Sequence, residues 1–298
     1  MQKSPFKLYD FLGYTFPGAF VLLGFMIAWV LYADFEKSIT LRRIVETAVA
    51  IFQEADWCRL AIFIFFAYII GHIVSYISSM TVEKLSIMLY GYPSEFLLQD
   101  TYYNPNVYLT TQAKKDVLAI IVVFVGLFPI VICEAIIAYL CRFRKYIIKP
   151  VDKNLQTAIT DKIVILINNL NLQRMFKNGE AESDFNRIVH HYIYSKGHNG
   201  TAKLDNYVAL YGFNRAFCLI FNICFICEGI MMLFGILEFN WLLLLATLLL
   251  SFIFFMAFMK FYRRYTLENF MDLIVESSLC PKASIHYNIQ YESSDTNQ

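Results

Sequence analysis

Charged residues are scarce in this sequence. They make up 16% of its 298 residues, and 25 Lys and Arg side chains are balanced by 24 Asp and Glu, which leaves a formal net charge of +1. A chain so close to neutral has no bulk field that would attract nucleic acid or an acidic substrate. We therefore expect no direct binding to duplex nucleic acid, and any role of charge has to be local.

Cysteine is too sparse for a disulfide scaffold. Of the seven cysteines, only Cys224 and Cys227 have a motif-like spacing, and they lie inside an apolar run without a second pair. His190 and His191 are adjacent, so on a helix they point in different directions and cannot chelate one ion together. The sequence therefore predicts buried free thiols, no metal site and no cofactor.

The common catalytic motifs are absent. The sequence contains no G-x-x-x-x-G-K-[ST], G-x-G-x-x-G, G-x-S-x-G or H-E-x-x-H pattern. Its apolar segments are also too few, and show no inverted repeat, for a monomeric secondary transporter. We predict that the chain is not an enzyme, with an intramembrane enzyme acting on lipid as an open alternative.

Hydrophobic residues, in contrast, are abundant. They reach 58% of the chain, with 28 Phe and 20 Tyr, against roughly 45–50% in soluble domains. A helix needs roughly 20 residues to cross a bilayer core. Five segments approach or exceed that length: Phe11–Tyr32, Cys58–Ser78, Val117–Cys141, Ala216–Leu237 and Trp241–Met259. The sequence predicts an all-α membrane protein with four or five transmembrane helices and a small cytoplasmic helical domain.

The distribution of Lys and Arg predicts the orientation. With five spans, one side receives five basic residues and the other nineteen, and the richer side is expected to be cytoplasmic. This places the C-terminus inside and the N-terminus outside, and we expect the first segment to be a retained span. In a four-span alternative, the Pro-containing first segment or the Glu134-bearing third is re-entrant or buried, and both termini are cytoplasmic.

We expect four parts along the chain. Residues 1–141 form a membrane domain with the first three apolar segments, 142–215 a cytoplasmic helical domain, 216–259 a transmembrane hairpin, and 260–298 a cytoplasmic helix and polar tail. These divisions follow the ends of the apolar runs.

Apolar residues recur at three and four positions from Leu155 to Leu170, the spacing of an amphipathic helix. A second helix is expected from Ser183 and a third from about Ala202, continuous with the fourth span. We expect further helices at about Arg42–Phe52 and Leu267–Val275 to pack beside this domain, and the tail Glu292–Gln298 to be disordered.

The second span carries a stripe of polar residues. His72, Ser75, Ser79 and Glu83 are spaced to lie on one helical face. Small and polar residues on one face are typical of tight helix packing with interhelical hydrogen bonds. The same residues could line a water-filled path, because an ionisable side chain within a span is costly unless it faces protein or water. Both interpretations require a partner helix.

Glu134 and Glu228 are ionisable residues inside other apolar runs. We weigh two hypotheses for them: a cation-attracting ring around the axis of an oligomer, or protonated or hydrogen-bonded packing residues. His72 and Arg59 are candidate partners. His198 lies in a Gly-containing loop with Lys196 and Lys203, and these three residues are candidates for ligand contact, with a solvated turn as the alternative.

Several short motifs resemble a known group of proteins. They are Tyr9-Asp10-Phe11-Leu12-Gly13-Tyr14 followed by Pro17-Gly18, Gly71-His72 with Ser75, Ser78 and Ser79, and Gly91-Tyr92-Pro93-Ser94. The chain resembles bacterial multi-pass inner-membrane effectors of phage-defence systems, the Hailong-type membrane effector among them. The resemblance covers about the first hundred residues and the entry into the fourth span, and no site residues are carried over from it.

The resemblance implies a bacterial inner-membrane location, a homo-oligomer, and a cytoplasmic portion that senses a nucleotide or a cytoplasmic protein. We therefore expect an oligomeric pore or ion channel whose opening is controlled by residues 142–215, acting in antiviral defence as an effector. The alternatives are a non-conducting membrane scaffold or sensor that recruits a soluble partner, and the lipid-modifying enzyme.

Overall fold

We describe the protein from a computed structural model. The structure describes residues 11–33, 41–53, 56–98, 117–138, 147–172, 185–196 and 201–276. Every regular element in these ranges is a helix, as the sequence predicts. Ser183, His198 and the tail Glu292–Gln298 lie outside the described residues.

Four long helices are apolar enough to cross a membrane. They are α2 (Phe16–Ala33), α4 (Trp57–Ser78), α14 (Thr201–Leu233) and α15 (Trp241–Val275). A π-helical turn, η1 (Phe11–Thr15), leads into α2. These helices confirm the first, second, fourth and fifth apolar segments as helices long enough to span a bilayer core.

Aromatic contacts show that α2 and α14 run in the same direction. Phe16 packs against Phe213 and Phe217, and one turn later Phe20 packs against Phe217 and Phe221. Residue numbers thus rise together along the two helices. The first turn of α2 therefore lies at the same level as Phe213, close to where α14 enters its apolar run.

Helices α2 and α4 are antiparallel and meet at two glycines. A Cβ atom placed on Gly18 would lie 1.8 Å from the carbonyl oxygen of Ala67, and one on Gly71 would lie 1.9 Å from that of Tyr14. Only glycine permits the backbones to approach so closely. Gly71, which directly precedes His72 of the polar stripe, is thus part of a helix crossing.

Helices α14 and α15 form an antiparallel hairpin. At one level Tyr211 packs against Phe258, and further along Ser251 Oγ donates a hydrogen bond to the Cys218 carbonyl oxygen at 3.1 Å. The connecting turn uses Gly235 at a φ of 69°, and Asn240 caps α15. Two long apolar helices thus pair in the part of the chain where the sequence predicts a hairpin.

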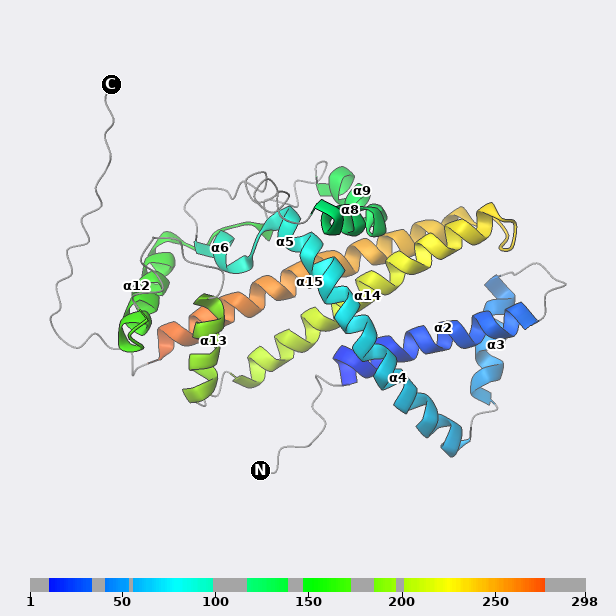
Figure 1. Ribbon diagram of the computed structural model, residues 1–298, viewed down its shortest axis with the longest axis horizontal. Helices are drawn as coiled ribbons and strands as arrows, with labels where there is room; N and C mark the ends of the chain where they lie inside the picture. The colour runs from blue at the N-terminus through cyan, green and yellow to red at the C-terminus, as the bar shows by residue number, and fades with distance from the viewer. Residues whose placement is uncertain are drawn as a thin grey trace, which may run out of the picture.

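These directions place the ends of the helices. Since α2 is parallel to α14 and antiparallel to α4, the start of α2, the end of α4, the start of α14 and the end of α15 share one end of the bundle (Figure 1). We call this the pocket end, after the cavity described below. The chain between α4 and α14 therefore leaves and returns at the pocket end.

The third apolar segment is bent rather than straight. It contains α8 (Val117–Gly126), α9 (Phe128–Cys133) and the π-helical η3 (Glu134–Ala138), and the two halves meet at 78°. Asn222 Nδ2 donates to the Gly126 carbonyl oxygen at 2.8 Å, at the point where the helix breaks. Because the chain returns to the pocket end, this geometry favours a re-entrant hairpin over a fifth span.

Shorter helices pack at the pocket end. They are η2 (Ser79–Glu83), α5 (Lys84–Tyr90), α6 (Pro93–Leu98), α12 (Lys153–Asn169) and α13 (Phe185–Lys196). The amphipathic face of α12 buries Ile159 and Leu166, and α13 buries Val189 and Ile193, in a core shared with α15. The predicted helices from Leu155 to Leu170 and after Ser183 are thus confirmed.

One placement expected from the sequence is wrong. The helix expected at Arg42–Phe52 exists as α3 (Leu41–Gln53), but it lies at the end of the bundle opposite α12 and α13 (Figure 1), next to α2. Residues Leu267–Val275 do pack beside α12 and α13, but they continue α15 without a break. The helix continues because no Pro or Gly interrupts α15 after its apolar run.

Candidate functional site

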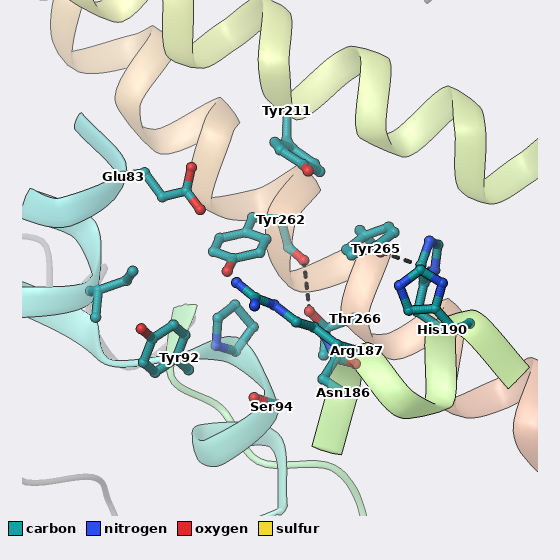
Figure 2. Close-up of a pocket in the computed structure, with 13 residues that line it drawn as sticks. Glu83, Tyr92, Ser94, Asn186, Arg187, His190, Tyr211, Tyr262, Tyr265 and Thr266 are labelled. Carbon is teal, nitrogen blue, oxygen red and sulfur yellow. Dashed lines mark hydrogen bonds between the residues drawn. The ribbon is translucent and has the colours of Figure 1, made fainter. Parts of the chain in front are cut away.

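A polar cavity of about 270 Å³ lies at the pocket end (Figure 2). We call it the pocket. Its walls come from η2, the α5–α6 junction, α13, α14 and α15. The lining residues range from Glu83 to Thr266, so segments that are far apart in the sequence meet there. Four tyrosines line it, together with one carboxylate, one guanidinium, two imidazoles and smaller hydroxyl and amide groups. Its size suits a small molecule rather than a peptide.

The α5–α6 wall of the pocket is formed where the backbone reverses between the two helices. Gly91 ends α5 with a φ of 79°, and its N–H bonds to the Ile87 carbonyl oxygen. Pro93 then opens α6, where its missing N–H costs nothing. The reversal places Tyr92 and Ser94 on the pocket wall. This Gly-Tyr-Pro-Ser stretch is one of the motifs that carried the sequence resemblance.

Glu83 connects the pocket to the membrane helices. It lies in the pocket wall, and its Oε2 atom forms an ion pair with Nη1 of Arg215 on α14. Arg215 also donates from Nε to Ser78 Oγ at 3.2 Å and from Nη2 to the Ser75 carbonyl oxygen at 3.5 Å. The Arg215 side chain is only 11% exposed. One buried cation therefore ties α14 to the end of α4.

A π-helical turn allows this contact. In η2, residues Ser79–Glu83 follow α4 without interrupting the helix, but the wider turn shifts the register of the residues after it. The Ser79 hydroxyl bonds back to the Tyr76 carbonyl oxygen of its own helix at 2.7 Å. Such single wide turns are frequent at functional sites in other proteins.

Helix α13 supplies the imidazole wall. His190 Nδ1 lies 3.1 Å from the Tyr265 hydroxyl oxygen, and the two are hydrogen-bonded. Burial lowers the pKa of His190 below its ordinary value; a hydrogen bond with Asn269 raises it, and His191 and Asp205 act in opposite senses. The imidazole is thus held neutral in the folded protein at neutral pH.

Two further contacts fix α13 on its neighbours. Tyr194 donates a hydrogen bond to Asp205 of α14, and burial, reinforced by this carboxylate, raises the pKa of Tyr194. Asn269 Nδ2 donates to Asn186 Oδ1 at 3.2 Å. Figure 2 shows Arg187 extending from α13 toward Tyr262. The pocket therefore has a cation, Arg187, on its α13 wall and an anion, Glu83, on its η2 wall, with phenol rings between them.

The predicted polar stripe does not form one face toward one partner. His72 is exposed, stacks on Tyr14 at 4.0 Å between ring centroids, and meets Tyr68 edge to face. The Ser75 carbonyl oxygen and Glu83 instead face Arg215 on α14. The wide turn of η2 lies between Ser75 and Glu83 and shifts the register of Glu83, which periodicity alone does not reveal.

Glu134 and Glu228 both have hydroxyl partners. The Tyr90 hydroxyl donates to Glu134 Oε1 at 2.8 Å, and the Thr247 hydroxyl donates to Glu228 Oε2 at 2.9 Å. The suggested partners His72 and Arg59 are wrong, since neither contacts these carboxylates in the described chain. The pocket described above is lined by none of His72, Glu134 and Glu228.

The two described candidates for ligand contact near residue 200 have different neighbours. Lys196 ends α13, exposed, with its Nζ 5.5 Å from the Tyr192 ring centroid, whereas Lys203 pairs with Glu268 at 2.8 Å. His198 lies outside the described residues. A role for these three in ligand contact stays a prediction.

The prediction that the cysteines are buried is wrong at two positions. Cys58 and Cys227 are exposed, whereas Cys133 and Cys218 are buried and Cys224 is intermediate. Within the described residues, no group of His, Cys, Asp or Glu could hold a metal ion.

Sequence reasoning missed Arg215, Arg187 and the pocket tyrosines. Arg215 had one available signal, because it stands directly before the apolar run that begins at Ala216. A cation at that depth requires a partner. Tyr211, Tyr262 and Tyr265 resemble ordinary interfacial aromatics in the sequence, and only the fold brings them together.

Comparison with known proteins adds no identity. Neither the protein-family models, the curated proteins nor the solved structures contain a match to this chain.

Proposed function

We propose that this chain is one subunit of a homo-oligomeric membrane pore whose opening is controlled at the pocket. The observation that carries the proposal is the double role of Glu83. The same carboxylate forms part of the pocket wall and pairs with the buried Arg215 that ties α14 to α4. A ligand or partner that binds Glu83 and weakens its ion pair with Arg215 would change how α14 packs on α4.

The pocket end is proposed to be cytoplasmic, in a bacterial inner membrane. In a four-span topology, only Lys37, Arg42, Arg43 and Arg59 belong to the opposite end, and the other basic residues belong to the pocket end. This bias exceeds the one obtained with five spans. Both termini, including the C-terminus, are then cytoplasmic.

The pore is proposed to lie between subunits. In the described chain, the polar side chains of the spans bond inward, as Glu134 does with Tyr90 and Glu228 with Thr247. His72 is different, because it is exposed on α4 beside Ile69 and Ile73. An imidazole on an apolar surface is costly in lipid, which favours a position against another copy or against water.

Flux from liposomes tests the proposal. Reconstituted protein should release K⁺, and Glu83→Gln should raise flux without added ligand, because the ion pair is intact in this packing of α4 on α14. Glu46→Gln is the matched control, since Glu46 is an exposed carboxylate paired with Arg42 on α3. Short nucleotides are the first probes of the pocket, as the sequence resemblance suggests.

A non-conducting scaffold is the second candidate. It is favoured by the inward bonding of the intramembrane carboxylates, which leaves no polar line along one described chain. If neither the wild type nor Glu83→Gln conducts, and cross-linked subunits are still recovered, the scaffold function replaces the pore. Monomers alone would contradict the oligomer.

A further inference from the structure

Helix α15 carries two opposite faces just beyond its apolar run. Tyr262, Tyr265 and Thr266 line the pocket. Lys260, Arg263 and Arg264, at spacings of three and four, fall on the other side of the helix. The basic face is therefore separate from the pocket and plays no part in the proposed control of the pore.

Arg263 is held in place on this face. Its Nη2 donates to the Lys149 carbonyl oxygen at 2.9 Å, in the segment that leads into α12. Its Nε is buried and has no hydrogen-bond partner in the described chain. A buried donor without an acceptor is costly, so this guanidinium is fixed in orientation and incompletely satisfied.

The neighbouring cations are uncompensated as well. None of Lys149, Lys260, Arg263 and Arg264 forms an ion pair within the described residues, whereas Arg215 pairs with Glu83 and Lys203 with Glu268. Lys260 has only an aromatic neighbour, with its Nζ 5.9 Å from the Phe261 ring centroid. The part of the chain that the structure describes therefore supplies no anion for this face.

The face lies at the depth of lipid headgroups. The apolar run from Trp241 to Met259 is about 28 Å long at 1.5 Å per residue, close to the thickness of a hydrocarbon core. Lys260 and Arg263 follow within the next helical turn. Basic clusters at this position attract anionic headgroups.

We propose that Lys149, Lys260, Arg263 and Arg264 bind the phosphate of an anionic phospholipid. Arg263 provides the fixed donors, since a guanidinium matches two phosphate oxygens. The other three cations add attraction without fixed geometry. The bound lipid would hold the segment at Lys149 against α15, and so hold α12 to the membrane helices.

Thermal unfolding of the purified protein in a non-ionic detergent tests this site. Phosphatidylglycerol should raise the Tm of the wild type, while phosphatidylcholine and inorganic phosphate should not. Arg263→Gln should lose most of that rise. Lys196→Gln, which removes an exposed cation from the end of α13, should keep it.

Native mass spectrometry provides a second readout if Arg263→Gln does not fold. The exposed Arg264→Gln should retain fewer phosphatidylglycerol molecules per subunit than the wild type. An equal Tm rise in wild type and Arg263→Gln, or equal retention in Arg264→Gln, would overturn the proposal. An equal rise with inorganic phosphate would identify a free-anion site and reject the lipid.

Discussion

The two helix pairs of the membrane region are held together in different ways. Along α14 and α15, aromatic rings pack in series, as where Phe254 stacks on Phe217 and Phe221. The α2–α4 pair instead depends on backbone contact at Gly18 and Gly71, and most of its side chains face outward. The comparison indicates a stable hairpin, α14–α15, and a second pair joined to it through few contacts.

The ion pair between the two helix pairs should give the largest effect. Arg215→Met would leave Glu83 without its cation, and breaking a partly buried pair of this kind costs about 3–5 kcal/mol. We expect a large drop in the thermal midpoint. Arg215→Met combined with Glu83→Gln should recover much of it, because no unpaired charge remains; an additive double variant would contradict the pairing.

The glycine crossing comes next. Gly18→Leu should separate α2 from α4 at a cost of about 3 kcal/mol, because a Cβ there meets the backbone of Ala67. Fluorescence of Trp29 and Trp57, in α2 and α4, should change while that of Trp241 in α15 does not. Gly24→Leu is the control, since a Cβ at Gly24 meets nothing within 4 Å.

The sequence predicts features that depend on neighbouring residues, but it does not predict contacts between residues that are far apart in the chain. Apolar density and helical spacing are local, so the long helices, α12 and α13 are predictable. The contact of Tyr90 with Glu134 joins residues 44 positions apart, and that of Glu83 with Arg215 joins residues 132 apart. Hydrophobic periodicity does not show which distant residues pair. In addition, the wide turn of η2 shifts the residues after it away from the helical positions that a regular period would predict.

The location of α3 shows the same limit. Its amphipathic pattern is recognisable, but the pattern does not say which end of the bundle it covers. The end is decided by the direction of α2, which follows from Phe16 and Phe20 packing on α14. Orientation from charge alone failed to decide between four and five spans for a related reason, since it counts residues and cannot detect the 78° bend of the third segment.

A smaller effect is expected inside the stable hairpin. Ser251→Ala removes the hydrogen bond to the Cys218 carbonyl oxygen, which is worth about 1 kcal/mol. The aromatic contacts nearby are unchanged, so the thermal midpoint should fall only slightly. A loss as large as that of Gly18→Leu would show that the hairpin is no more robust than the α2–α4 pair.

The pH dependence of α13 gives the smallest expected effect. Burial lowers the pKa of His190 below its ordinary 6.5, so the unfolded chain binds the proton more readily. The neutral imidazole of His190 therefore makes its full contribution to folding stability above about pH 6.5, and this contribution declines as the pH falls below that value. His190→Gln should flatten the slope of Tm between about pH 5 and 7, whereas an unchanged slope would assign it to groups other than His190.

Charge exchange across the Glu83–Arg215 pair tests the central claim most directly. The measurement is K⁺ flux from liposomes containing Glu83→Arg, Arg215→Glu or the double exchange. The account predicts raised flux in both single variants, where like charges face each other, and flux near the wild-type level in the double variant. Single variants that conduct no more than the wild type, or a double variant as leaky as either single one, would contradict it.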